Sequence, residues 1–213
     1  MGRPVVLLTI SANTGADYLN TPYYKSRAEY AIKHGYDEVT LLPPEMAPAT
    51  SSWVKVPVMM HLAKKFDVLF LDNDVVVNDT APSVEEFAPQ ESGFYAALGH
   101  SGRPNAGVLL SRGGEIEPLK EAMKRRSDPP PLPLQAPYEN GHLIWALRDL
   151  GFFALSKAFN DCDGDDGFFI HHTGPNLDKR SIVYDDSWKQ SSSHPSFKQT
   201  VDDLLNSLEV DGF

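Results

Sequence analysis

Residues 66–77 constrain the fold more than any other part of the sequence. Apart from Asp67, they begin with a short apolar run, which predicts a buried strand, and continue directly into Asp72, Asn73 and Asp74. Because side chains alternate between the two faces of an extended chain, Asp72 and Asp74 are expected to point to the same side and Asn73 to the other.

Two carboxylates at the carboxyl end of a strand suggest a metal site. Open α/β sheets bind ligands at this end of their strands, and hard oxygen ligands suit Mg²⁺ or Mn²⁺ carrying a phosphate group. A strand that simply ends in a polar turn would carry the same residues. The two aspartates alone therefore leave both interpretations open.

The order of the neighbouring elements predicts the fold class. Residues 5–10 are continuously apolar, as in a central parallel strand, and a helix over 24–34 and a strand over 38–42 follow. An amphipathic helix over 57–65, with Pro57 in its first turn, leads into the acidic strand. The sequence predicts a single α/β domain of 213 residues, with a mixed, mostly parallel central sheet flanked by helices.

The second half of the chain supplies further elements. Asn140 is expected to cap a helix over 143–150, and a last amphipathic helix is expected over 201–208. Other strands are expected over 94–98, 107–111 and 167–172, and another helix over 116–123.

Composition excludes several classes of function. The formal net charge of -10 argues against nucleic-acid binding, because phosphate backbones select basic surfaces. The single cysteine, Cys162, excludes an intramolecular disulfide and fits a reducing compartment. No apolar run approaches the ~18 residues of a membrane-spanning helix, so we expect a cytoplasmic protein without a membrane span.

Two familiar ligand-binding patterns are missing. The chain has no Gly-rich phosphate fingerprint of a dinucleotide or P-loop site. The acidic residues 161–167 fail the calcium-loop pattern, since the turn glycine falls one position late and His172 stands where a glutamate is needed. We expect this segment to be a solvated loop near the site.

A histidine pair follows the last predicted strand. His171 and His172 precede Gly174, a residue that lets a ligand approach the backbone closely. A neutral imidazole can complete the coordination of a Mn²⁺ ion already held by two aspartates. Combined with Asp72 and Asp74, the pair favours the metal interpretation.

At this point the motifs resemble a known family. Residues 71–74 resemble the DxD motif of GT-A glycosyltransferases, which bind a nucleotide-sugar diphosphate through a divalent cation. Residues 53–56, 105–108, 139–141 and 171–174 resemble further motifs of glycogenin-like and lipopolysaccharide-galactosyltransferase enzymes, in the same order. The resemblance covers about residues 5–180, and the overall sequence also resembles the first domain of a chlorovirus glycosyltransferase that modifies the viral capsid protein.

The resemblance implies a set of site residues and a cofactor, Mn²⁺ or Mg²⁺ with Mn²⁺ favoured. The implied metal ligands are Asp72, Asp74 and His171, with His172 as the alternative to His171. The implied catalytic residues are Glu139 and Asn140. The implied donor-binding residues are Thr9, Ser11, Asn13, Lys55, Asp72, Asn105, Gly107, Gly174 and Lys179.

The sequence departs from the family at two positions. Gly141 replaces a second acidic residue, and Leu177 stands where the family has a lysine three residues after the glycine, so Lys179 or Arg180 would have to reach the phosphate.

The resemblance also implies an activity. A hexose or deoxyhexose would move from a UDP-sugar to a glycan or glycoprotein acceptor with retention of configuration, in viral capsid glycosylation in the host cytoplasm. The nucleotide-binding part would span about residues 1–80 and the acceptor side about 81–213, in a monomer or a part of a longer multidomain chain.

Two chemical questions stay open at this stage. Asn140 is a poor nucleophile, which favours attack from the leaving-group side, whereas Glu139 would permit a covalent double displacement. An apolar strand followed by Asp-x-Asp also opens haloacid-dehalogenase-type phosphatases, with Asp72 as nucleophile, although two strands precede it here. An inactive nucleotide-sugar-binding module is a further alternative.

Overall fold

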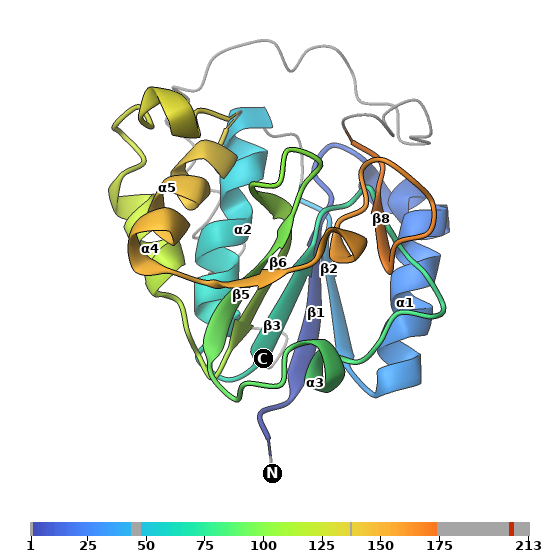
Figure 1. The fold of residues 1–213 in the computed structure, drawn as a ribbon. Helices are drawn as coiled ribbons and strands as arrows, with labels where there is room; N and C mark the ends of the chain where they lie inside the picture. The colour runs from blue at the N-terminus through green and yellow to red at the C-terminus, as the bar shows by residue number, and fades with distance from the viewer. Residues whose placement is uncertain (1, 44–47, 137, 174–204, 207–213) are drawn as a thin grey trace.

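The computed structural model describes residues 2–43, 48–136, 138–173 and 205–206. Its centre is a six-stranded sheet with the strand order β2-β1-β3-β6-β5-β7 (Figure 1). The strands are β1 (Val5–Ile10), β2 (Asp37–Leu41), β3 (Asp67–Leu71), β5 (Gly93–Leu98), β6 (Pro104–Arg112) and β7 (Phe153–Leu155).

The direction of the strands confirms the predicted mixed, mostly parallel sheet. Strand β1 runs parallel to both β2 and β3, and β5 runs parallel to β7. Strand β6 is antiparallel to both of its neighbours, β3 and β5, so it runs against the other five strands. The carboxyl end of β3 therefore lies beside the amino end of β6, which brings Leu71 opposite Val108.

A second, two-stranded sheet extends the structure beyond β3. Strand β4 (Val75–Val77) pairs antiparallel with β8 (Phe169–His171), and Val75 lies opposite His171. This pairing joins the segment after the acidic turn to a segment almost a hundred residues later in the chain. Figure 1 shows β8 beside α1.

Helices cover both faces of the central sheet. The α-helices are α1 (Pro22–His34), α2 (Pro48–Leu62), α3 (Val84–Phe87), α4 (Glu117–Lys124) and α5 (Asn140–Leu150). Short 3-10 helices are η1 (Gly15–Asn20), η2 (Leu132–Leu134) and η3 (Lys157–Phe159). Alternate residues of β1 separate two cores, because Val6 and Leu8 pack with α2, α4 and α5 while Val5 and Leu7 pack with α1, α3 and the small sheet.

The predicted start of the helix before β3 is wrong. Helix α2 begins at Pro48, so Pro57 lies inside it and not in its first turn. A proline inside a helix removes one backbone hydrogen bond and disfavours the helix locally. Here Val54, Val58 and Met59 are fully buried, and their packing holds the helix together on both sides of the proline.

The predicted cap of α5 is also wrong. Glu139 occupies the N-cap position, and Asn140 is the first residue of the helix. The side chain of Asn140 is used elsewhere, since its Oδ1 accepts a hydrogen bond from the Ala106 backbone N–H at 3.1 Å. The predicted helix over 201–208 lies outside the described residues except for 205–206, which are helical.

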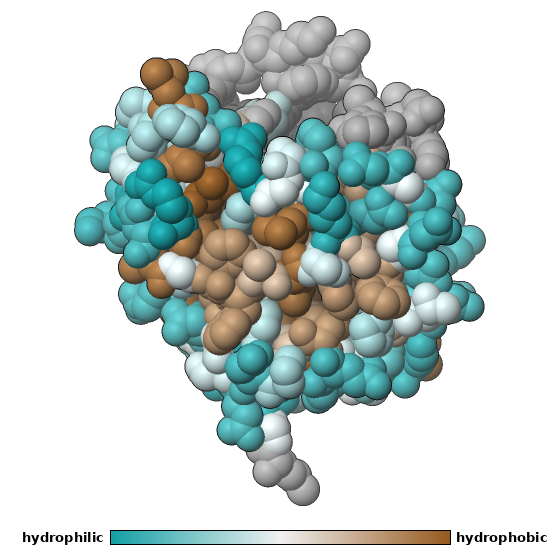
Figure 2. Space-filling view, in the orientation of Figure 1, coloured by the Kyte–Doolittle hydropathy of each residue, from teal (hydrophilic) through white to brown (hydrophobic). Residues whose placement is uncertain are grey.

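The surface combines polar and apolar regions. Figure 2 shows apolar residues gathered across the middle of the face drawn in Figure 1, with polar residues around them. Within the described ranges, no helix has the length and apolar character needed to cross a membrane.

Candidate metal centre

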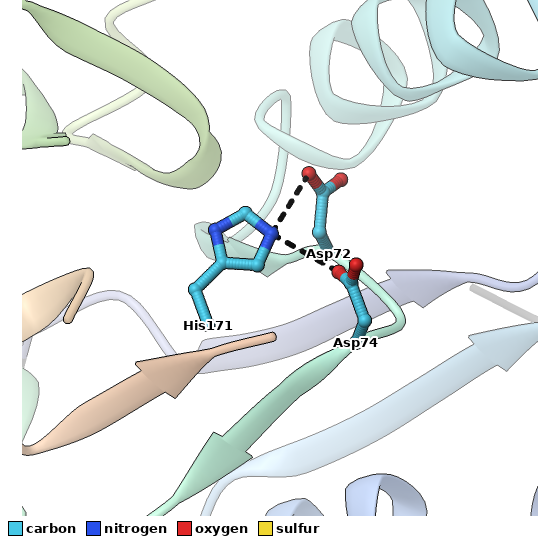
Figure 3. Close-up of side chains that lie close together, drawn as sticks. All are labelled: Asp72, Asp74 and His171. Carbon is cyan, nitrogen blue, oxygen red and sulfur yellow. Dashed lines mark ion pairs between the residues drawn. The ribbon is translucent and has the colours of Figure 1, made fainter. Parts of the chain in front are cut away.

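The acidic turn and β8 bring three potential metal ligands together (Figure 3). Nε2 of His171 lies 3.0 Å from Oδ1 of Asp74 and 3.9 Å from Oδ2 of Asp72. One ligand atom from each of the three side chains lies within 4.8 Å of the others. The pairing of Val75 with His171 explains the approach, because it fixes β8 directly beside the end of the turn.

The two aspartates converge for a different reason from the one that the sequence suggests. Strand β3 ends at Leu71, and residues 72–74 form a turn in which the Val75 N–H donates to the Asp72 carbonyl at 3.1 Å. The expectation that Asp72 and Asp74 lie on an extended strand is therefore wrong. They nevertheless face the same imidazole, because the turn redirects the chain into β4.

Burial makes the charges in this cluster interdependent. Asp74 and His171 are buried, while Asp72 is partly exposed. Burial lowers the pKa of His171, but the adjacent Asp74 carboxylate outweighs burial and raises that pKa to about 10. The two carboxylates thus stabilise the positive charge of a protonated His171. A divalent cation bound beside them would supply positive charge at the same place.

The donor set fits a divalent cation of intermediate softness. Carboxylate oxygens suit Mg²⁺ and Mn²⁺, and an imidazole nitrogen shifts the preference towards Mn²⁺. Asp72, Asp74 and His171 supply these atoms from three positions around one point.

Lys55 connects the metal centre to the interior. Its Nζ lies 2.7 Å from Oδ1 of Asp72 and 3.0 Å from Oε1 of Glu139, and it donates to the Ala106 carbonyl at 3.1 Å. Nζ also lies 4.6 Å from the centre of the Phe70 ring. Burial lowers the pKa of Lys55, but the carboxylates of Asp72 and Glu139 outweigh burial and raise it above its usual value. The predicted donor-binding lysine is thus a buried cation between two carboxylates.

Strand β6 forms the wall opposite the histidine. Asn105 Oδ1 accepts from the Gly107 N–H at 2.7 Å, and the Gly107 carbonyl accepts from the Asp72 N–H at 2.8 Å. A Cβ atom on Gly107 would lie 2.3 Å from Cε1 of His171. Only glycine fits at this position with His171 where it is.

The structure brings most of the predicted site residues into one connected cluster. Its members come from α2, the acidic turn, the start of β6, the start of α5 and β8. They are Lys55, Asp72, Asp74, Asn105, Gly107, Glu139, Asn140 and His171.

Two of the residues predicted at the end of β1 contact the end of β3 and the acidic turn away from the metal ligands, at Leu71 and Asn73. Thr9 is buried, and its hydroxyl donates to the Leu71 carbonyl at 3.0 Å. Ser11 is also buried and accepts from the Asn73 side chain at 3.0 Å. Asn13 is exposed and has a left-handed backbone conformation, with φ of 64°.

The remaining predicted residues divide into two groups. Gly174, Lys179 and Arg180 lie outside the described residues. His172 lies beside the cluster, but its Nδ1 is 2.9 Å from the hydroxyl of Tyr23. Its backbone N–H donates to the Asp74 carbonyl at 3.0 Å, so His172 contacts the acidic turn through its backbone.

Sequence reasoning missed a buried arginine that supports the acidic turn. Arg27 is 1% exposed, and its guanidinium donates to the Thr9 hydroxyl at 2.6 Å, the Asp72 carbonyl at 3.0 Å and the Asn73 carbonyl at 3.4 Å. The predicted helix over 24–34 contains this residue. The sequence does carry one signal for it, because Arg27 lies on the same helix face as the apolar residues Tyr23, Tyr30 and Ala31.

The acidic loop before β8 is a structural loop beside the site. The carboxylate of Asp161 accepts from the backbone N–H groups of Asp163, Gly164 and Gly167, at 3.0, 2.8 and 3.1 Å. The Asp161 carbonyl accepts from the His171 N–H at 2.9 Å. This agrees with the expected loop near the site, and Asp163 is exposed.

Comparisons by sequence find no match. Neither a protein-family model nor a curated protein matches the chain.

Comparisons by structure find glycosyltransferases. A glycosyltransferase involved in glycosylation of the major capsid of PBCV-1 has a TM-score of 0.62 at 18% identity, over 83% of this chain and 97% of that one. The chain has the GT-A fold. Drosophila β-1,4-galactosyltransferase 7, a mutant in complex with manganese, UDP-Gal and xylobiose, has a TM-score of 0.50 at 14% identity, over 92% of this chain and 83% of that one. GlyE of Streptococcus pneumoniae has a TM-score of 0.50 at 13% identity, over 99% of this chain and 64% of that one.

The GT-A fold confirms the resemblance drawn from the motifs, including the resemblance to a viral capsid glycosyltransferase. At these identities the likeness is one of fold. The phosphatase alternative is not favoured, because Asp72 follows the third strand of a GT-A sheet.

Proposed function

We propose that the chain is a metal-dependent glycosyltransferase that moves a hexose or deoxyhexose from a UDP-sugar to a glycan acceptor. The observation that carries the proposal is the cluster of Asp72, Asp74 and His171 at the carboxyl end of β3. In an open α/β sheet, ligands bind at this end of the strands. The GT-A fold supports the same assignment.

The three ligands have unequal roles in this proposal. A divalent cation held here would supply Lewis-acid chemistry at the diphosphate leaving group. Asp74 and His171 would be the main residues to hold it, since both are buried and their ligand atoms lie 3.0 Å apart. Asp72 contributes one oxygen, because its Oδ1 is already 2.7 Å from Lys55.

Lys55 acts as a positioning residue between the two halves of the site. Its ammonium makes contacts with Asp72, Glu139 and the Ala106 carbonyl, which use its three N–H donors. It therefore fixes the distance between the metal ligands and the amino end of α5. Its positive charge also pairs with the buried carboxylate of Glu139.

Glu139 and Asn140 would lie next to the reacting sugar. The Asn140 carboxamide is oriented by its hydrogen bond from Ala106, and a neutral amide is a poor nucleophile, which supports attack from the leaving-group side with retention. The ion pair of Glu139 with Lys55, through Oε1 at 3.0 Å, lowers the nucleophilicity of its carboxylate. We therefore propose the single-step route and retain double displacement as the alternative.

The donor nucleotide is assigned to the first part of the chain. Thr9, Ser11 and Asn13 would form the wall for uracil and ribose, and Gly174 and Lys179 would contact the phosphates. The division near residue 80 into a nucleotide part and an acceptor part belongs to the same proposal. A role in capsid glycosylation and a cytoplasmic location stay predictions.

The test is a donor screen. The purified chain would be incubated with UDP-glucose, UDP-galactose, UDP-xylose and GDP-mannose, each with Mn²⁺ or with EDTA, and release of the nucleotide diphosphate measured. We expect release from at least one UDP-sugar with Mn²⁺ and loss of that release in EDTA. Equal turnover in EDTA would contradict the metal mechanism, and UDP binding without turnover of any donor would favour the inactive binding module.

A further inference from the structure

We propose that Asn160 is a positioning residue that fixes the tautomer and direction of His171, so that Nε2 faces the metal centre. This rests on the metal-dependent function proposed above. Asn160 directly follows η3 and is fully buried. Its Oδ1 lies 2.7 Å from Nδ1 of His171, on the opposite side of the ring from the two aspartates.

The hydrogen bond selects one form of the imidazole. A neutral imidazole carries one N–H, and a carboxamide oxygen can only accept a hydrogen bond. With Oδ1 facing the ring, Nδ1 must carry a hydrogen whether the ring is charged or neutral. When a cation replaces the proton on Nε2, the lone pair of Nε2 is therefore the one that faces the metal centre. The other tautomer would place two acceptors 2.7 Å apart and would turn an N–H towards the cation. Partners of this kind orient metal-binding histidines and set their tautomer.

The orientation of the amide has its own support. Nδ2 of Asn160 lies 3.6 Å from Sγ of Cys162, and that thiol donates to the Asn160 carbonyl at 3.4 Å. Both residues are buried. With Nδ2 directed at the sulfur, Oδ1 remains directed at the histidine.

Strand β6 also approaches the imidazole closely, near Nδ1 and Cε1. A Cβ atom on Gly107 would lie 2.3 Å from Cε1 and 2.7 Å from Nδ1 of His171. The backbone of β6 and the side chain of Asn160 therefore both limit where the Nδ1 side of the ring can lie. Rotation of the ring away from Asp74 would break the hydrogen bond to Asn160, so the two contacts hold one ring orientation together.

Three variants separate positioning from a general loss of structure. Asn160→Leu removes the acceptor with little change of size, Asn160→Asp keeps an acceptor at the same place, and Cys162→Ala changes the other buried neighbour. The affinity for Mn²⁺ alone would be measured by electron paramagnetic resonance of the free ion. Loss of an outer partner of a metal-binding histidine typically weakens metal binding about 10- to 100-fold, so we expect that loss in Asn160→Leu. We expect Asn160→Asp to bind within about threefold of the unmodified chain, because it keeps an acceptor at Nδ1. Cys162→Ala should lose less affinity than Asn160→Leu, because it removes the support of the amide but keeps the acceptor.

The tautomer itself gives a second measurement that does not depend on any variant folding. Nitrogen-15 spectra of the unmodified chain loaded with Cd²⁺, a diamagnetic substitute for Mn²⁺, should show His171 protonated at Nδ1 and coordinated through Nε2. Coordination through Nδ1 would overturn the proposal. Unchanged Mn²⁺ affinity in a folded Asn160→Leu variant, or a loss of affinity in Asn160→Asp as large as in Asn160→Leu, would also overturn it.

The measurements also separate this inference from the proposed activity. A chain that binds Mn²⁺ with the expected tautomer but transfers no sugar would contradict the glycosyltransferase proposal and leave the role of Asn160 intact. A chain that binds no Mn²⁺ at all would overturn both.

Discussion

The ammonium of Lys55 lies 2.7 Å from Oδ1 of Asp72, and this contact joins the metal centre to helix α2. The same ammonium is 3.0 Å from Oε1 of Glu139, whose side chain is 6% exposed, whereas that of Asp72 is 30% exposed. One oxygen of Asp72 is therefore committed to the lysine, and the other faces His171. This division explains why Asp74 is the stronger candidate for the main carboxylate ligand.

Removing the charge of Lys55 should destabilise the whole domain. In Lys55→Met, the methylene packing is largely kept but Glu139 is left as a buried carboxylate without its cation. Breaking a buried ion pair from one side typically costs about 3–5 kcal/mol, and we expect a loss of unfolding free energy in that range, measured by urea denaturation. Lys64→Met, an exposed change two residues beyond the end of α2, is the matched control and should have little effect.

A second substitution tests whether the lost stability comes from Glu139. Adding Glu139→Gln to Lys55→Met removes the uncompensated charge, so the double variant should be more stable than Lys55→Met alone. A double variant that is less stable than the single one would show that the lysine acts through other contacts.

Gly107→Ala tests the close approach of β6 to the histidine. The added Cβ would lie 2.3 Å from His171, so the ring must move away from Asp74 or the strand must shift. Overpacking of this kind costs about 1–3 kcal/mol, and we expect a weaker Mn²⁺ affinity together with this loss of stability. Gly99→Ala, one residue beyond the end of β5, is the control, because its Cβ would meet no atom closer than 3.4 Å, and metal binding in this variant should be unchanged.

Much of the fold could be predicted from the sequence because the signals are local. The continuous apolar run of residues 5–10 indicated a central strand, and the structure confirms it as β1. The acidic residues after β3 indicated the ligand-binding end of the sheet, because that end is fixed by strand direction. The order of the motifs then indicated that residues distant in sequence share one site, and Asp72, Asp74 and His171 do lie together.

The rest could not be predicted because it depends on tertiary packing. Pro57 looked like a helix start, since nothing local shows that buried contacts carry α2 through it. Arg27 and Asn160 carry no motif, and the partners through which they act on the site, in the acidic turn and in β8, lie more than ten residues away in the chain. The role of Lys55 also depends on tertiary packing, because Asp72 and Glu139 reach it from other segments.

The two aspartates should differ in their effect on metal binding. Asp74→Asn removes a buried carboxylate 3.0 Å from His171 and should weaken Mn²⁺ affinity more than Asp72→Asn, whose Oδ2 is 3.9 Å away. Loss of an outer partner alone typically weakens binding about 10- to 100-fold, so we expect a loss beyond about 100-fold for Asp74→Asn. Calorimetric titration with Mn²⁺ measures both. Asp79→Asn, an exposed change just beyond β4, is the control and should bind Mn²⁺ like the unmodified chain. A greater loss of Mn²⁺ affinity in Asp72→Asn than in Asp74→Asn would reverse the proposed roles.

The adjacent histidines provide the final comparison, because the motif alone assigns the metal to either of them. His171 is 3% exposed and its Nε2 faces both aspartates, whereas Nδ1 of His172 lies 2.9 Å from the Tyr23 hydroxyl. We therefore expect His171→Gln to abolish measurable Mn²⁺ binding, since it removes a ligand. His172→Gln should leave Mn²⁺ binding nearly unchanged and reduce only stability, by about 1 kcal/mol for one lost hydrogen bond. Tyr23→Phe removes the same hydrogen bond from the other side and should reproduce the His172→Gln result in both measurements. If Mn²⁺ affinity were instead lost in His172→Gln and kept in His171→Gln, the metal ligand would be His172.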